Sequence, residues 1–399
     1  MIYLVITVFE GILRSLRFSS RKCVVSATGA SVIVFFSLYM LDSQMIERYV
    51  YVNEILSLLG FVAFLRKPVI YKRGDYLYNS VLVYLGVCVV FGIISLFFFV
   101  SFYGYLRNLV LLYSVFSFFL GKYLYQHFEK GLWNFVLLFA VVYFLCLFSR
   151  CYFYETIAVS FLPMVLWYVD RCKILYLCIL GVLVSFLYGK STPAAVVLFW
   201  IYVMVLHKFS GFKFFALLTV GLVIGALFWM EGAFKLMVHV HSFAELGPLF
   251  RNTVYAYDPD TLTRLYLWYQ SFVKFLGHPW GIGFGTPLFC GKCVPVTDVS
   301  KIPILPYVMG SHNSYIYVLV RLGVEGFVAL VSITFSVFFY FFKFKEELDS
   351  KKMSLFLSFF AIVVAAMFNV VLESPIGAPA FWVMLGMVYG VIAELRVLE

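Results

Sequence analysis

The chain has 399 residues, of which 64% are hydrophobic and only 13% are charged. A water-soluble globular protein cannot carry so much apolar side chain, so this composition excludes a soluble domain and predicts a polytopic membrane protein. The net charge of +10 would fit a nucleic-acid-binding protein, but the basic residues fall between apolar segments, so we expect no nucleic-acid partner.

Apolar segments of about 20 residues recur along the chain and predict an all-α protein with about twelve transmembrane helices. With a cytoplasmic N-terminus, 19 of the 30 Lys and Arg residues lie in the cytoplasmic connections, which places both termini in the cytoplasm. Ahead of the first span, residues 1–22 predict an interfacial amphipathic helix. The predicted spans are 23–41, 50–65, 77–101, 105–121, 132–149, 155–169, 174–189, 193–207, 214–230, 323–342, 353–371 and 377–394.

One long connection, 231–322, separates the ninth and tenth predicted helices and is periplasmic in this topology. We treat 1–399 as a single membrane domain and expect this partly helical loop to carry the active site, because long loops usually have a function. Within the loop, Cys290 and Cys293 would form a structural disulfide in an oxidising compartment; a redox site is the alternative.

Three motifs follow one another in this loop. Asp260 or Thr261 is expected to cap a helix that presents Arg264 and Trp268 on one face. A glycine-rich turn, Pro279-Trp280-Gly281-Ile282-Gly283, comes next. The third motif runs from Gly310 through His312 and Asn313 into an apolar helix. Polar and ionisable residues at the mouth of a membrane bundle are costly to place and usually have a task.

In order and placement, these motifs resemble the O-antigen polymerase and O-antigen ligase superfamily of bacterial membrane glycosyltransferases. The resemblance implies a GT-C-like fold in the bacterial inner (cytoplasmic) membrane, and a donor and acceptor that are oligosaccharides on undecaprenyl diphosphate. The sequence departs from the family at Lys190, where many members carry arginine, and at Arg321, where an acidic residue is common. The matching residues are Arg264/Trp268, Pro279/Gly281/Gly283, His312-Asn313-Ser314-Tyr315-Ile316 and Leu322-Gly323-Val324-Glu325-Gly326.

Glycosyl transfer from a diphosphate needs cations near the leaving oxygen, and it requires no metal or other cofactor. We predict Arg264 for this role, with Arg251, Lys190 and Arg150 in support. His312 is predicted to be the base that takes the proton of the acceptor hydroxyl, because a helix starting just after it would favour its neutral imidazole. Further predicted substrate contacts are Asn313, Tyr315, Trp268 and Arg321.

Several of these residues also have simpler explanations. His312 could be a helix cap, Arg264 a lipid-phosphate anchor, and Arg150 and Arg321 side chains that extend to the membrane surface. Asp258-Pro259-Asp260 has the spacing of a metal-binding pair, but its central proline favours a turn. Glu373 and Glu155 lie close to apolar spans, where a cation partner or a role as an alternative base is expected.

The function favoured by these observations is a polymerase that adds a growing glycan to a new lipid-linked repeat unit, with membrane lipids and a chain-length regulator as further partners. A ligase that transfers the glycan to lipid A core would use the same donor chemistry. A lipid-linked oligosaccharide flippase is the alternative from another class, and it would be expected to show two related halves, which are not evident.

Overall fold

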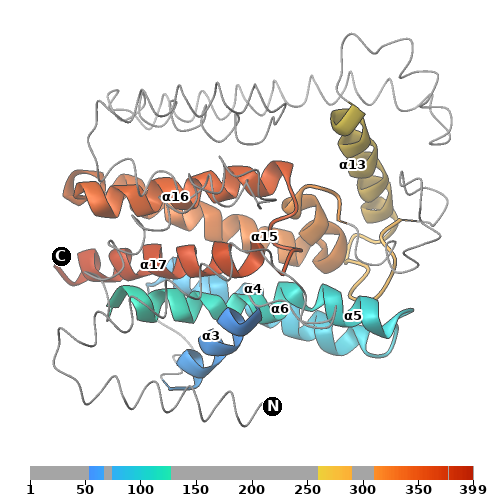
Figure 1. Ribbon diagram of the computed structural model, residues 1–399, viewed down its shortest axis with the longest axis horizontal. Coiled ribbons are helices and arrows are strands. Elements are labelled where there is room, and N and C mark those ends of the chain that lie inside the picture. The colour runs from blue at the N-terminus through green and yellow to red at the C-terminus, as the bar shows by residue number, and fades with distance from the viewer. Residues whose placement is uncertain (1–53, 67–73, 127–258, 290–309, 376, 399) are drawn as a thin grey trace, which may run out of the picture.

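The computed structural model describes residues 54–66, 74–126, 259–289, 310–375 and 377–398 (Figure 1). These residues form helices and turns, with no strand among them. Four helical segments of this part are long and apolar enough to cross a membrane. The described part is therefore all-α and has the character of a membrane protein. The four segments are Tyr76–Ser95, Phe102–Gln126, Ser314–Lys343 and Gly377–Val397.

The predicted spans can be compared with these helices one by one. Six of the twelve lie outside the described residues, so the total number of spans stays a prediction. Predicted span 77–101 ends early, at Ser95. A new helix then starts after Ser101, whose side chain caps it by accepting a hydrogen bond from Gly104 N. In chain order the helices are α3 (Glu54–Arg66), α4 (Tyr76–Ser95), α5 (Phe102–Asn108), α6 (Val110–Tyr113), the 3-10 helix η1 (Ser114–Phe116), α13 (Pro259–Gly277), α15 (Ser314–Lys343), the 3-10 helix η4 (Lys345–Glu347), α16 (Ser350–Phe368) and α17 (Gly377–Leu398).

The long helix α15 is broken at Gly323, whose backbone has φ +65° and ψ −165°. We call Ser314–Leu322 the first arm and 324–343 the second arm. The two arms fold back on each other. This is shown by the hydroxyl of Tyr315, which lies 3.3 Å from that of Thr334, 19 residues further along. In a straight helix these residues would be about 28 Å apart. The second arm coincides with predicted span 323–342, and the first arm is an additional short helix beside it.

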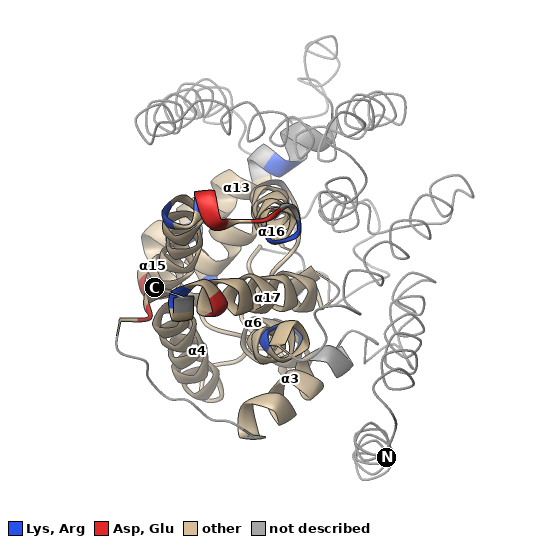
Figure 2. Cartoon of the chain, turned by 90° about the vertical axis from the view of Figure 1, so that its left-hand side faces the viewer, with Lys and Arg blue, Asp and Glu red and all other residues tan. Residues whose placement is uncertain are grey.

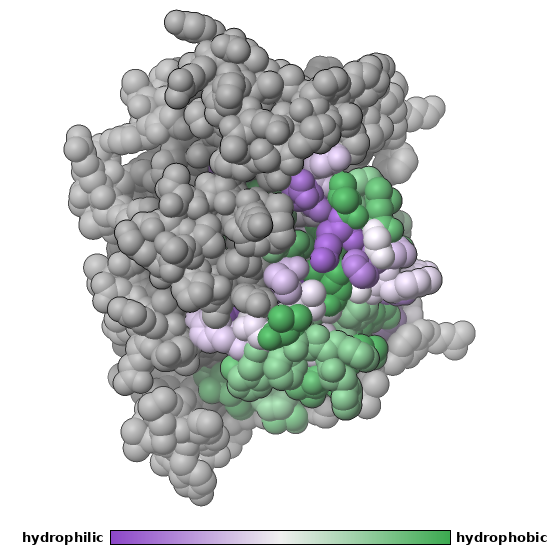
Figure 3. Space-filling model, turned by 90° about the vertical axis from the view of Figure 1, so that its right-hand side faces the viewer, coloured by the Kyte–Doolittle hydropathy of each residue, from purple (hydrophilic) through white to green (hydrophobic). Residues whose placement is uncertain are grey.

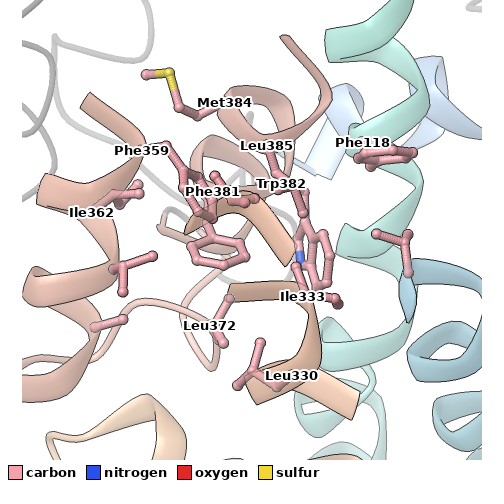
Figure 4. Close-up of a cluster of buried hydrophobic side chains, with 14 of the residues drawn as sticks. Phe118, Leu330, Ile333, Phe359, Ile362, Leu372, Phe381, Trp382, Met384 and Leu385 are labelled. Atoms are coloured by element: carbon pink, nitrogen blue, oxygen red, sulfur yellow. The ribbon is translucent and has the colours of Figure 1, made fainter. Parts of the chain in front are cut away.

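The core lies where α15, α16 and α17 pack together, with the chain near Phe118 on the far side of α17 (Figure 4). Phe381 and Trp382 of α17 stand at its centre, and both are fully buried. Phe381 packs against Phe359 of α16 with ring centroids 5.4 Å apart, and Trp382 packs against Tyr84 of α4 at 5.3 Å. These aromatic contacts fix α17 between its neighbours.

One end of the bundle, called the basic end here, gathers Lys and Arg residues together with several acidic residues. Here Arg396 of α17 pairs with Asp75 at 3.4 Å, and Lys352 pairs with Glu394 at 2.7 Å. Figure 2 looks onto this end, where Lys and Arg residues mark the ends of α15, α16 and α17. The positive-inside rule would turn this end toward the cytoplasm, although the orientation itself stays a prediction.

The opposite end is formed by the glycine-rich loop 278–289, the turn 310–313 and the loop that joins α16 to α17. Figure 3 looks onto this end and shows hydrophilic residues gathered between hydrophobic surfaces. Helix α13 crosses this end of the bundle (Figure 1) and packs against α15. It begins at Pro259, a residue suited to the first helical position because it lacks an N–H. Asp260 and Thr261 therefore lie inside the first turn, and the prediction that one of them caps the helix is wrong.

Candidate functional site

The glycine-rich loop binds directly to the break in α15. The N–H of Ile282 donates to Val320 O at 2.9 Å, and the N–H of Gly283 donates to Arg321 O at 3.0 Å. In return, Val324 N donates to Pro279 O at 3.2 Å. The break leaves carbonyls of the first arm without helical partners, and the loop supplies the missing donors. Two of the predicted motifs, the glycine-rich turn and the Leu-Gly-x2-Gly segment, thus form one junction.

The glycines of this junction are required by close backbone contact. A Cβ on Gly281, which has φ +90°, would lie 2.6 Å from Arg321 O. The amides of the loop are also committed to protein partners, since Phe284 N donates to the Ser95 hydroxyl at 2.8 Å. With Ile282 and Gly283 bonded to α15, the loop is better explained as a structural turn than as a phosphate-binding loop.

Arg321 holds the same loop from inside the protein. Its side chain is fully buried, and Nη1 donates to Gly283 O at 3.1 Å and to Thr286 O at 2.5 Å. The guanidinium carbon also stands 5.2 Å from the centroid of the Tyr317 ring. The prediction that Arg321 extends to the membrane surface is therefore wrong. Arg321 fixes the loop, and its contact with substrate stays a prediction.

Replacing Arg321 by alanine is expected to destabilise the protein, because the buried carbonyl of Gly283 and the partly buried carbonyl of Thr286 lose their donor. Each such loss costs about 1–3 kcal/mol, so a lower unfolding temperature should be measurable in detergent. Lys343→Ala, which removes an exposed cation near the end of the same helix, is the matched control and should have little effect. Equal unfolding temperatures for the two variants would contradict this role of Arg321.

The turn before α15 has an unusual backbone at His312. Its φ is +54°, and it is the one non-glycine residue with positive φ in the described segments. Asn313 caps the first arm, because its Oδ1 accepts hydrogen bonds from Tyr315 N and Ile316 N, each at 3.0 Å. A left-handed backbone is costly for such a residue and is often found at functional sites. The predicted helix start just after His312 is confirmed. The side-chain oxygen of Asn313 accepts the two capping hydrogen bonds of this helix.

Glu373 is brought to the same turn by the loop that joins α16 to α17. Its Oε2 accepts a hydrogen bond from the hydroxyl of Ser314, the first residue of the first arm. Its Oε1 lies against Gly310, where an added Cβ would be only 2.8 Å away. Burial raises the pKa of Glu373 to about 7, although the bond from Ser314 acts in the opposite direction. The predicted cation partner is not found among the residues that the structure describes.

The other predicted site residues divide into two groups. Arg264 and Trp268 are half-buried on α13, which packs on α15 and ends at the glycine-rich junction. Tyr315 is buried in the first arm, and its hydroxyl contacts Thr334. The sequence predicts Glu373 only as an alternative base, because a sequence pattern cannot place a residue about sixty positions away beside the His312 turn. Arg251, Lys190, Arg150, Glu155, Cys290 and Cys293 lie outside the described residues.

No protein-family model matches the chain, and no curated protein matches its sequence. The candidate site therefore rests on structural features of this chain alone. These are the turn at His312, the carboxyl of Glu373 beside that turn, and the junction between the glycine-rich loop and α15 at which α13 ends.

Proposed function

We propose that the protein is a membrane glycosyltransferase, a polymerase of O-antigen or a related surface polysaccharide. It transfers a growing glycan from undecaprenyl diphosphate to a new lipid-linked repeat unit at the periplasmic face of the bacterial inner membrane, without a metal. The single observation that carries this proposal is the turn at His312, where a left-handed backbone precedes a capped helix whose other end bonds to the glycine-rich loop.

The chemistry asked of these residues is simple. The acceptor hydroxyl gives its proton to the His312 imidazole as its oxygen bonds to the sugar carbon. At the same time the bond from that carbon to the phosphate oxygen breaks, and the electron pair leaves with undecaprenyl diphosphate. Arg264 stabilises the charge that grows on the leaving oxygen, with Arg251, Lys190 and Arg150 as proposed supports.

The backbone of His312 supports a functional role for this residue. A left-handed conformation costs a non-glycine residue about 1–2 kcal/mol, and histidine tolerates it better than most residues but less readily than glycine. The cap by Asn313 and the hydrogen bonds of Ser314 hold the residues that follow it, and so over-determine the turn. This is the arrangement expected when the direction of a side chain matters more than local stability.

Arg264→Ala is expected to lower kcat/KM for glycan elongation by about 100-fold to 1,000-fold, because an oriented cation is lost from the leaving group. The assay uses purified protein in lipid nanodiscs, lipid-linked repeat units and excess chelator. Lys274→Ala is the matched control, since Lys274 is a half-buried cation further along the same helix. Equal, small effects of both changes would instead support a lipid-anchoring role for Arg264.

The same preparation separates the alternative functions. Glycan transfer to lipid A core as the sole acceptor, without elongation of repeat units, would identify a ligase. Movement of lipid-linked oligosaccharide across the membrane of a vesicle, without any new glycosidic bond, would identify a flippase. Elongation of repeat units in the presence of chelator is the result that the proposed function requires.

A further inference from the structure

The carboxyl of Glu373 has one oxygen that the described part of the protein does not use. The residue is only 8% exposed, and its Oε1 is buried without a hydrogen-bond partner among the described residues. A buried polar atom left in this state costs about 1–3 kcal/mol, which makes it a candidate for binding something else. Because Oε1 lies against Gly310, the unused oxygen is aimed at the turn that carries His312.

The hydrogen bonds of Ser314 determine how this carboxyl can act. The Ser314 hydroxyl accepts from Val371 N at 3.0 Å and from Leu372 N at 2.9 Å, which uses both of its lone pairs. The hydroxyl proton of Ser314 is therefore left to donate. Its closest acceptor is Glu373 Oε2, and Asn369 O lies further away at 3.3 Å. Oε2 is occupied as an acceptor, so any proton that the carboxyl carries lies on Oε1.

The surroundings of Glu373 select the kind of ligand. The groups that act on it electrostatically or by hydrogen bonds are the Ser314 hydroxyl, the backbone N–H groups of Glu373 and Val371, and the hydroxyls of Tyr317 and Tyr84. None of these groups is a cation, and a buried carboxyl among them disfavours an anionic ligand such as a phosphate. A carboxyl in this state can both donate and accept through Oε1, which matches a sugar hydroxyl.

We propose that Glu373 is a glycan-binding residue, whose Oε1 hydrogen-bonds a hydroxyl of the acceptor sugar lying against Gly310 and the His312 turn. Ser314 is its positioning residue, because it holds Oε2 and so fixes the direction of Oε1. This inference rests on the proposed function, since it takes the acceptor to be a lipid-linked glycan. The contact between Glu373 and the acceptor sugar would place the reacting hydroxyl next to His312, the proposed base.

Three variants test the proposal by equilibrium binding of the lipid-linked repeat unit in nanodiscs. Glu373→Leu keeps the approximate volume but removes both oxygens, and it should weaken binding at least about tenfold. Glu373→Gln keeps a donor and an acceptor and should restore most of that affinity. Gly310→Ala keeps the carboxyl but puts a methyl group 2.8 Å from Oε1, which displaces that oxygen, so it should weaken binding as Glu373→Leu does.

Elongation kinetics and thermal unfolding complete the experiment. Glu373→Leu should raise KM for the acceptor more than it lowers kcat, whereas a purely structural role would lower the unfolding temperature of the Leu and Gln variants alike. The exposed Glu346, at the basic end, provides the control Glu346→Leu, which should bind normally.

The two proposals fail in different ways. Normal binding and normal KM in Glu373→Leu, in a wild-type protein that elongates glycan, overturn the role of Glu373 and leave the proposed function intact. Binding that depends on Glu373 in a protein that forms no glycosidic bond overturns the polymerase and supports the glycan contact. A wild-type protein that neither binds nor elongates the repeat unit overturns both.

Discussion

Replacing His312 by asparagine is expected to reduce glycan elongation by about 1,000-fold, while the fold and the binding of the repeat unit are retained. Asparagine tolerates the left-handed backbone at φ +54° better than most residues, so this change removes the base without removing the turn. General base catalysis contributes about 10²- to 10⁴-fold, which sets the expected loss. A single-turnover assay with purified protein and lipid-linked repeat units measures it directly.

His312→Ala and His312→Gly sharpen the interpretation. Alanine loses the base and also strains the turn, whereas glycine loses the base and relieves the strain. If His312 is the base, all three variants lose elongation to a similar extent. An asparagine variant that elongates normally would show that the backbone conformation matters and that the imidazole does not, and the assignment of the base would then be wrong.

Much of the helical structure follows from local sequence signals. The second arm of α15, together with α16 and α17, lies within a few residues of three predicted spans, because long apolar stretches with polar ends leave few alternatives. The start of the first arm was equally accessible, since Asn313 stands directly before an apolar helical pattern and caps it. These local signals do not predict which helices come together to form the candidate site.

The residues that hold the site together were harder to predict. The sequence offers the membrane surface as a place for Arg321, but the structure turns the side chain inward onto carbonyls of a loop about forty residues earlier. Glu373 meets Ser314 across a longer gap of 59 residues, and no periodic pattern connects the two. A glycine followed by apolar residues does not by itself predict that a helix breaks and folds back, as α15 does at Gly323. The sequence signal for this contact is the presence of glycines in two separate motifs, Gly281 and Gly323, which allow the two backbones to approach closely.

Replacing Gly323 by alanine is expected to destabilise the protein by about 3–5 kcal/mol, which is a large share of the stability of a typical domain. The conformation at φ +65° and ψ −165° is essentially restricted to glycine, and a Cβ there would lie 2.5 Å from the Trp280 carbonyl carbon. Because that neighbour is backbone, the junction cannot give way without losing its hydrogen bonds to the first arm. Gly86→Ala is the matched control, since nothing lies within 4 Å of an added Cβ there and alanine favours a helix. Gel filtration and thermal unfolding in detergent compare the two; a Gly323→Ala protein as stable as Gly86→Ala would mean that the break in α15 does not determine the site.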